Sequence, residues 1–430
     1  MADKRISIGL LGYGTVGSNV YRLLDDQARD ISEATGSSIF IKKILVRDPS
    51  QPRPGAPQDI FTSDFADILD DDEISIAVEL IGGVDPAYDF VSDLLKKGKA
   101  VVTANKQLLS RRGAHLFELA RENSTRIQFE ASVAGAIPVI KVLRESMVAA
   151  DLKSISGIVN GTTNYVLTEM GRTGSKYEDA LARAQERGYA EADPTEDING
   201  KDAAAKMAIL ASIAFHTPVG LDDVACAGIE NISSLDIAFA GELGYTIKLL
   251  GVARLYGERV NVRVHPALVP DDHPLATVSG AYNAVFLKGT AIDEIMLSGP
   301  GAGGMETASA VLSDMVSIVT RPQVSPLENP VAYRNLGFFP DDDVVSTFYL
   351  RLEVKDEPGV LAAIARVFGD NGVSIESVIQ KGRGAHAELV MIFHPVREAS
   401  FQAALDTIVN LEGVRGKPRP IRVEGKEHEH

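Results

Sequence analysis

Residues 5–27 read RISIGLLGYGTVGSNVYRLLDDQ, and this pattern indicates how the N-terminal part of the chain folds. A short apolar run ends in a glycine-rich turn, after which apolar side chains recur at helical spacing. In this setting each glycine of the motif GYGTVG has its own role. Gly12 permits the tight turn, Gly14 lets a pyrophosphate approach the backbone, and Gly17 lets the helix pack closely on the strand. We therefore predict a strand, a turn and a helix that bind a dinucleotide at the helix N-terminus.

The rest of the chain divides into segments of different pattern. Apolar runs at 39–46, 74–83 and 100–106 alternate with helical patterns, which indicates βαβ units and a parallel sheet. Near the C-terminus the order of elements is βαββαβ, the ferredoxin-like unit. We predict an α/β protein with a Rossmann-like doubly wound domain at 1–130, an α+β domain for catalysis and dimerisation at 131–320, a linker at 321–344, a ferredoxin-like domain at 345–425 and a tail at 426–430.

The composition excludes several classes of function. A formal net charge of −16 argues against a nucleic-acid partner, because phosphate binding needs a basic surface. No run approaches the roughly twenty apolar residues that a membrane span requires, and the N-terminus lacks the layout of a signal peptide. The single cysteine, Cys226, excludes an intramolecular disulfide and is typical of a reducing cytoplasm. Because no histidine lies near it in the sequence, we expect Cys226 to fill the core.

A dense group of charges precedes a buried helix pattern. Residues 191–206 read EADPTEDINGKDAAAK and lead directly into the apolar run MAILASIAF. Asp202 and Lys206 stand four residues apart and share one face of a helix, which Ile209 and Ile213 continue as an apolar face. The two side chains either form an ordinary surface ion pair or lie at the buried edge of the helix as part of a site.

Ligand-binding positions are also expected outside the carboxyl ends of the predicted parallel strands. Lys106 follows one strand in the sequence TANK, where it is either a partly desolvated site residue or an ordinary loop lysine. Gly82 ends a neighbouring strand, and a backbone without a side chain there would admit a nicotinamide ring. After the second strand, Arg47 would favour the 2′-phosphate of NADP, whereas Asp48 would favour the 2′-hydroxyl of NAD. The sequence leaves that choice open and favours NADP only slightly.

Seven motifs occur in an order that is specific to one family. They are the glycine-rich turn, GGVDPA, VVTANKQLL, EASVAGAIP, GIVNGTTNY, EADPTEDINGKDAAAK, and GPGAG with TASAV. They span nearly the whole chain and resemble homoserine dehydrogenase, in the stand-alone form without a fused aspartate kinase. The C-terminal unit, with DEPGVLA, resembles an ACT domain. One departure is Met305-Glu306 before Thr307, where many relatives have Pro next to the Thr.

The resemblance implies reversible NAD(P)-dependent interconversion of L-homoserine and L-aspartate 4-semialdehyde. Lys206 would carry the proton at the substrate oxygen, and Lys106 would stand beside the nicotinamide and the substrate. The other residues that the resemblance implies are Glu191, Asp202 and Asp197 for the substrate; Gly12, Gly14, Thr15, Val16, Gly17, Arg47, Gly82, Lys106, Gly188 and Gly303 for NADP or NAD; and Glu130 with the carbonyls of Val133, Gly135 and Ile137 for a monovalent cation, Na⁺ or K⁺.

Two other functions would share some of these features. An aspartate-semialdehyde dehydrogenase would share the dinucleotide turn but needs a nucleophilic cysteine, and the surroundings of Cys226 do not suit that role. A non-catalytic amino-acid sensor would have no need for an intact set of lysines and carboxylates at 106, 191, 202 and 206.

The ACT-like domain suggests regulation. Such domains generally pair across a dimer and bind an amino acid, so we expect a homodimer or tetramer with L-threonine as the favoured effector. The candidate contacts are the turn at 356–359 and Asn371-Gly372. The alternative is a domain that only aids assembly.

Overall fold

The computed structural model describes residues 4–324, 334–383 and 386–425, and they belong to two compact units. Unit 1 comprises Met1–Gly161, Asp202–Val224 and Tyr282–Asn335, and unit 2 comprises Thr162–Lys201, Ala225–Ala281 and Leu336–His430. Within the described ranges, no helix is long and apolar enough to cross a membrane.

Unit 1 contains a six-stranded parallel sheet in the order β3-β2-β1-β4-β5-β6. This order is that of a dinucleotide-binding sheet, and it places the point where strand order reverses between β1 and β4. The predicted Rossmann-like domain is confirmed. The strands are β1 (Lys4–Leu11), β2 (Ser37–Leu45), β3 (Phe61–Thr62), β4 (Ile74–Glu79), β5 (Ala100–Thr103) and β6 (Ile127–Gln128).

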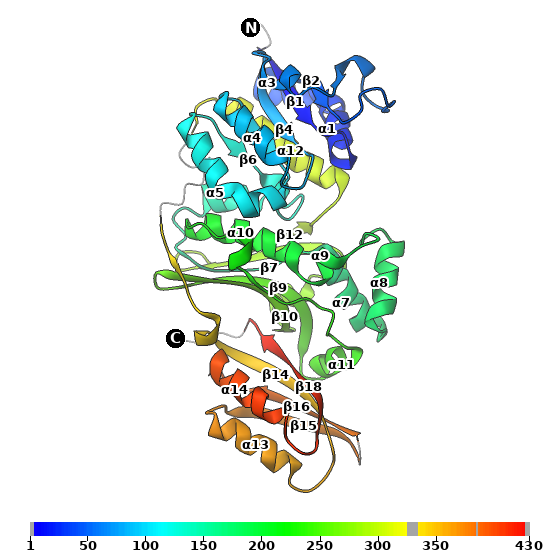
Figure 1. The fold of residues 1–430 in the computed structure, drawn as a ribbon, viewed down its shortest axis with the longest axis vertical. Helices are drawn as coiled ribbons and strands as arrows, with labels where there is room; N and C mark the ends of the chain where they lie inside the picture. Colours follow the sequence, from blue (N-terminus) through cyan, green and yellow to red (C-terminus); the bar gives the residue numbers. More distant parts are fainter. Residues whose placement is uncertain (1–3, 325–333, 384–385, 426–430) are drawn as a thin grey trace. The chain divides into compact units, whose positions relative to one another are not determined.

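Helices cover this sheet because its strands are apolar on both faces. In β1, every residue from Ile6 to Leu11 is buried, as expected for a parallel strand between two helical layers. One helix, α12 (Gly304–Thr320), comes from far along the chain and lies among the N-terminal elements in Figure 1. Gly304 allows this approach, since a Cβ there would lie 2.9 Å from Thr15 Cγ2. The other helices are α1 (Thr15–Asp26), α2 (Ala28–Thr35), α3 (Ala66–Leu69), α4 (Ala87–Lys96) and α5 (Lys106–Glu122).

The remainder of unit 1 is a smaller α+β part. Strand β11 (Tyr282–Gly289) pairs antiparallel with both β7 (Leu152–Ile158) and β12 (Asp293–Pro300). Helix α10 (Lys201–Phe215) is buried almost all round, which explains its run of Ala and Ile residues. The short helix α6 (Val139–Lys141) follows the turn that was predicted to hold a cation.

Unit 2 carries the predicted ferredoxin-like domain. Its strands run β18-β14-β16-β15 with antiparallel pairing, and the long hairpin of β9 and β10 joins them where β10 pairs in parallel with β18. Phe348 of β14 stacks on Phe401 of α14 at 3.9 Å between ring centres. The elements are α7 (Gly161–Thr173), α8 (Tyr177–Glu186), α9 (Thr195–Ile198), β8 (Ala225–Cys226), α11 (Ser234–Glu242), β9 (Tyr245–Tyr256), β10 (Arg259–Pro270), β13 (Gly337–Phe338), β14 (Val345–Val354), α13 (Val360–Asp370), β15 (Ile375–Arg383), β16 (His386–Phe393), β17 (Val396–Arg397), α14 (Glu398–Ile408) and β18 (Val414–Val423).

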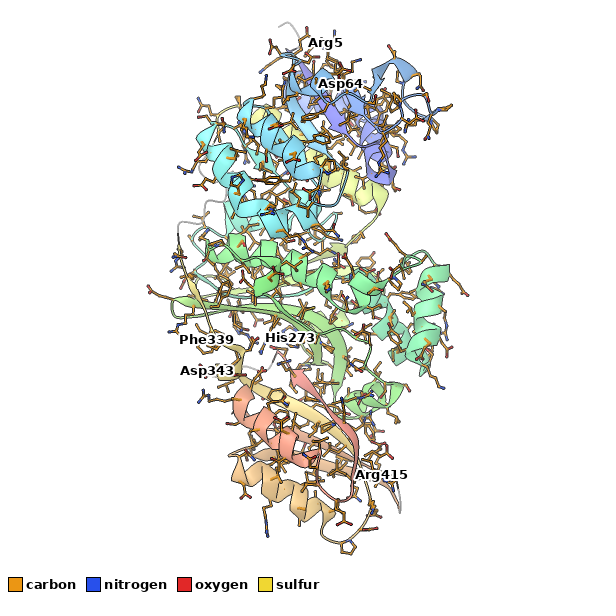
Figure 2. The ribbon with its side chains drawn as sticks, in the orientation of Figure 1. Arg5, Asp64, His273, Phe339, Asp343 and Arg415 are labelled. Carbon is orange, nitrogen blue, oxygen red and sulfur yellow. The ribbon has the colours of Figure 1, made fainter. Side chains whose placement is uncertain are left out.

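The predicted linker is shared between the two units, since its residues up to Asn335 belong to unit 1 and those from Leu336 onwards belong to unit 2. Phe339 stacks on Tyr256 with ring centres 4.3 Å apart, and Asp343 pairs with Arg397 (Figure 2 labels Phe339 and Asp343). Residues 325–333 of that linker and the tail at 426–430 lie outside the described residues.

The expectation for Cys226 is wrong. The side chain is exposed and does not fill the core. It lies on the two-residue strand β8, which pairs with Arg263 and Val264 of β10, and its thiol lies 3.2 Å from the carbonyl oxygen of Asn199. The lack of a nearby histidine suggested a packing role, but both side chains of this two-residue strand are exposed.

Buried charges join the ferredoxin-like domain to β10. Arg263 of β10 pairs with Glu398 at 2.5 Å, and Glu398 also accepts from Arg422 Nε at 2.7 Å and from Ser346 at 2.9 Å. Burial alone would raise the pKa of Glu398, but the two guanidinium groups and the hydroxyl lower it to about 2. The carboxylate therefore stabilises the folded state while it stays ionised.

Glu398→Gln is expected to lower the free energy of unfolding at pH 7 by about 2–3 kcal/mol. A carboxyl group whose pKa is lower in the folded than in the unfolded state stabilises the fold at any pH above its unfolded-state pKa. That difference from the unsubstituted protein should shrink as the pH falls from about 4.5 towards 2. Urea unfolding at pH 7 and pH 3 measures it, with the surface substitution Glu33→Gln as the control. A difference that stays constant over this range would contradict the assignment.

Candidate active site

The glycine-rich turn has the geometry that a pyrophosphate needs. Gly12 has φ +103°, and a Cβ there would lie 2.9 Å from the carbonyl oxygen of Leu80. A Cβ at Gly17 would collide with the carbonyl oxygen of Gly12, so helix and turn touch directly. At Gly14, by contrast, a Cβ would meet no atom within 4 Å. The first and third glycines thus serve packing, and the second leaves open space for a ligand.

The N-terminus of helix α1 can also bind phosphate oxygens. The helix begins at Thr15 with Gly14 as its N-cap, and no side chain caps it. The first backbone N–H groups, including those of Thr15 and Val16, therefore lack the usual side-chain acceptor. The residues present fit a dinucleotide, and they would supply its phosphates with backbone donors.

The two candidates for recognising the adenosine ribose differ in their surroundings. Arg47 is exposed just beyond β2. The Asp48 carboxylate accepts from the backbone N–H and hydroxyl of Ser50, at 2.9 and 2.6 Å, and these hydrogen bonds lower its pKa. The Asp48 side chain is thus engaged by its own loop.

The ends of β4 and β5 present the next two predicted residues. Gly82 has φ +78°, and a Cβ there would meet no atom within 4 Å. Lys106 is the first residue of α5, whose N-cap Asn105 accepts from the backbone N–H of Leu108 at 3.0 Å. Both residues lie at the carboxyl edge of the sheet, where doubly wound folds bind ligands.

Asp202 is the centre of the charge cluster. Its side chain is only 4% exposed and forms ion pairs with Lys106, through Oδ1, and with Lys206, through Oδ2 at 2.8 Å. Asn160 donates to Oδ2 at 2.8 Å. Burial alone would raise the pKa of Asp202, but the two ammonium groups hold it below its usual range. A surface ion pair is therefore excluded, and Asp202 is an ionised carboxylate between two lysines.

Lys206 is held from two directions. Its ammonium donates to Asp202 and, at 2.7 Å, to the carbonyl oxygen of Val159. Its side chain is 11% exposed, whereas that of Lys106 is 35% exposed. Sequence reasoning missed Val159 and Asn160, although both lie in the quoted motif GIVNGTTNY.

Three other predicted residues lie on unit 2, in the segment that precedes α10. Glu191 is exposed, and Gly188 has φ +75° at the turn after α8. Asp197, in α9, has Oδ2 at 3.1 Å from the hydroxyl of Thr162, which also lies 2.6 Å from the carbonyl oxygen of Tyr189. Within unit 2 these contacts attach the segment to the start of α7.

Gly303 is the N-cap of α12 and has φ +141°, which favours glycine. A Cβ at this position would collide with the carboxylate of Glu306. The departure Met305-Glu306 therefore places a carboxylate in the first turn of α12, where its negative charge interacts favourably with the positive end of the helix dipole.

The turn predicted to hold a cation is buried except at Ala136, and Gly135 is tightly packed. Ala134 and Gly135 have φ +59° and +57°, and a Cβ at Gly135 would lie 2.7 Å from the backbone of Gly301. The Glu130 carboxylate accepts from the backbone N–H groups of Ile140 and Lys141, at 2.8 and 2.9 Å. Burial and the neighbouring Asp314 raise its pKa to about 7. The side chain of Glu130 thus caps α6, whereas Val133, Gly135 and Ile137 belong to the turn itself.

Comparison with known proteins assigns the chain to a family. The model of homoserine dehydrogenase matches residues 138–316, that of the homoserine dehydrogenase NAD-binding domain matches 12–130, and that of the ACT domain matches 348–413. The homoserine dehydrogenase of Bacillus subtilis is 41% identical over 430 residues, which cover 98% of this chain and 99% of its own. The chain belongs to the homoserine dehydrogenase family. The predicted family and fold class are confirmed.

Solved homoserine dehydrogenases share this fold. The enzyme from Thiobacillus denitrificans has a TM-score of 0.91 and 39% identity, and the match covers 98% of each chain. A hyperthermophilic archaeal homoserine dehydrogenase in complex with NADPH has a TM-score of 0.61 and 26% identity over 73% of this chain and 97% of its own. The cofactor class is therefore a nicotinamide dinucleotide. The domain boundaries and individual site residues of this member of the homoserine dehydrogenase family stay predictions.

Proposed function

We propose that the protein catalyses the reversible NAD(P)-dependent interconversion of L-homoserine and L-aspartate 4-semialdehyde. The observation that carries this proposal is the buried Asp202, paired with Lys106 and Lys206 in the same unit as a dinucleotide-binding sheet. The cofactor takes or gives the hydride, and the protein supplies orientation and a proton carrier.

Lys206 is the proposed proton carrier. An ammonium group has three N–H donors, and two of them are directed at Asp202 and Val159. The third would reach the substrate oxygen: as the hydride leaves the carbinol carbon of homoserine, the amine form takes the hydroxyl proton. In the reverse direction the ammonium form protonates the developing alkoxide. Lys106, at the carboxyl edge of the sheet, would hold the same oxygen from the side of the cofactor.

Carboxylates are proposed to bind the substrate ammonium group. A carboxylate has about four acceptor positions, and Lys106, Lys206 and Asn160 occupy three of those on Asp202. One position remains for the substrate. Glu191 and Asp197 of unit 2 stay proposed substrate residues, and within that unit Asp197 lies 3.1 Å from the hydroxyl of Thr162.

Initial rates in both directions test the proposal. Purified protein is assayed with homoserine and NADP⁺ or NAD⁺, and in reverse with aspartate semialdehyde and the reduced cofactors. We expect turnover with homoserine and a higher kcat/KM with NADP⁺, because exposed Arg47 suits a 2′-phosphate whereas Asp48 is engaged by Ser50. Binding of homoserine without any turnover would support the amino-acid sensor instead.

A monovalent cation, Na⁺ or K⁺, is proposed to bind Glu130 and the carbonyls of Val133, Gly135 and Ile137. Support for this site comes from the positive φ values of the consecutive residues Ala134 and Gly135, which give the turn an irregular backbone next to the buried Glu130. We expect the melting temperature to be several degrees higher in 100 mM KCl or NaCl than in choline chloride of equal ionic strength, because the cation binds only the folded state. Equal melting temperatures in the three salts would contradict the site.

The ACT domain is proposed to bind L-threonine at its turn 356–359 and at Asn371-Gly372, with homo-oligomerisation to a dimer or tetramer. The turn leads into α13 through Gly359 at φ +95°, and Gly372 at φ +71° follows the other end of that helix. Millimolar L-threonine is expected to lower the initial rate and raise the melting temperature, while L-alanine does neither. If threonine has neither effect, the domain serves assembly only.

The cytoplasmic location also stays a prediction.

A further inference from the structure

Three strand ends meet beside the last residue of β4, Glu79. In the sheet, Glu79 lies in register with Leu11 of β1 on one side and with Thr103 of β5 on the other. Leu11 leads into the glycine-rich turn, and Thr103 leads into the segment that ends at Lys106. Glu79 therefore occupies the carboxyl edge at the reversal of strand order, where a dinucleotide crosses such a sheet.

The carboxylate of Glu79 is fully buried and binds both neighbouring loops. Oε1 accepts from the backbone N–H of Ile81 at 2.8 Å and from that of Gly82 at 3.2 Å. Oε2 accepts from the hydroxyl of Thr103 at 2.6 Å. Asn105 Nδ2 lies 3.5 Å from Oε1. A buried carboxylate with this many donors fixes their positions, since releasing any one of them leaves a charged oxygen without compensation.

Asn105 extends this arrangement to the helix that begins at Lys106. Its Nδ2 donates to the carbonyl oxygen of Gly83 at 2.7 Å, and its backbone N–H donates to the hydroxyl of Thr103 at 3.0 Å. Its Oδ1 caps α5 through Leu108. The turn at Gly82 and the first residue of α5 are thus connected through Asn105 and Thr103, and Glu79 accepts from both.

The pyrophosphate turn rests on the same segment. A Cβ at Gly12 would lie 2.9 Å from the carbonyl oxygen of Leu80 and 3.4 Å from the backbone nitrogen of Ile81. Ile81 is one of the two residues whose N–H groups the Glu79 carboxylate holds. A shift of residues 80–81 would therefore displace the backbone that packs against the glycine-rich turn.

We propose that Glu79 is a positioning residue that holds the pyrophosphate turn, the Gly82 turn and the start of α5 in one arrangement. It touches neither the substrate nor the cofactor, and acts by presenting the cofactor and Lys106 together. The inference rests on the proposed function, because it assigns Lys106 and the Gly82 turn to one active site. Apolar packing would fill the same space as this buried carboxylate, but it would not bind the two loops.

Glu79→Ala and Glu79→Gln separate this role from simple stability. The alanine variant is expected to raise the Kd for NADPH at least tenfold and to lower kcat about 10–100-fold, because displacements near 1 Å have effects of that size. In the glutamine variant, the amide oxygen still accepts from Ile81 and Gly82. We therefore expect its Kd for NADPH to stay within about threefold of the unsubstituted protein. Isothermal titration with NADPH and steady-state rates with homoserine measure both quantities.

Val78→Ala is the matched control. Val78 is a fully buried neighbour on the same strand, so its truncation lowers the melting temperature without touching either loop. If Glu79→Ala changes the Kd and kcat no more than Val78→Ala does, Glu79 is merely structural. If the glutamine variant bound NADPH as weakly as the alanine variant, that result would also overturn the proposal.

Thr103→Val keeps the inference testable if Glu79→Ala does not fold. Loss of the hydroxyl that donates to Glu79 should weaken NADPH binding in the same direction, by about three- to tenfold, and an unchanged Kd would contradict the proposal. The NADPH titrations need no substrate. A failure of homoserine turnover in the unsubstituted protein would refute the proposed function. An equal Kd for NADPH in the unsubstituted protein and in the Glu79 and Thr103 variants would refute the role of Glu79 alone.

Discussion

Lys206→Met is expected to lower kcat for homoserine oxidation about 10²–10⁴-fold, the usual range for removing a positioned proton carrier. The methionine side chain has a similar length and no proton to exchange. Binding of NADPH should be unchanged within a factor of about two, because the cofactor turn lies on the sheet and Lys206 on α10. Steady-state rates together with cofactor titrations give both readouts.

Lys206→Arg distinguishes proton transfer from charge. A guanidinium group would retain the ion pair with Asp202 but cannot lose its proton in a protein. The expected kcat of the arginine variant is therefore close to that of the methionine variant. Lys201→Ala, an exposed lysine at the start of the same helix, is the control and should keep full activity. If the arginine variant kept more than about a tenth of kcat, Lys206 would have an electrostatic role only.

Asp202→Asn is expected to lower kcat/KM for homoserine about 10²–10³-fold and to destabilise the fold by about 3–5 kcal/mol. The substitution leaves Lys106 and Lys206 facing each other without the carboxylate that now separates them, and removing one partner of a buried ion pair has a cost of that size. An asparagine would also direct an N–H group at one of the ammonium groups. The decrease in kcat/KM should arise mainly from a higher KM, because Asp202 is proposed to bind the substrate ammonium group.

The control for this prediction is Asp193→Asn. Asp193 is an exposed carboxylate of the same charged segment and accepts only from Thr195, its near neighbour, among the contacts of the described chain. Urea unfolding and steady-state rates of the two variants are compared. Equal effects of the two substitutions would mean that Asp202 has no special role, and a loss confined to stability would remove it from substrate binding.

Several features of the fold could be predicted because their causes are local. The roles of Gly12 and Gly17 follow from contacts within one strand, turn and helix, and the structure shows both contacts. The apolar patterns of the C-terminal unit likewise predict four strands and two helices, in the observed order apart from the two-residue strand β17. Cys226 was misplaced, because its burial depends on how many strands flank β8 and not on its neighbours in the sequence.

The candidate site was predicted only in part. Helical spacing placed Asp202 and Lys206 on one face, but it left open whether the pair lies on the surface or in the interior. The structure decides this through Lys106 and Asn160, which come from other elements and surround the same carboxylate. No local pattern indicates that Asp202 has more than one cationic partner.

The sequence by itself determined the dinucleotide turn, the charged start of α10 and the succession of elements, because short-range sterics and side-chain periodicity control them. The partners of the buried charges are visible only in the folded chain, where Asp202 pairs with two lysines and Glu79 binds the loops that follow two strands. The physical reason is that burial and hydrogen bonding of a charge depend on segments distant in the chain, which meet when parallel strands align their carboxyl ends at one edge of a sheet.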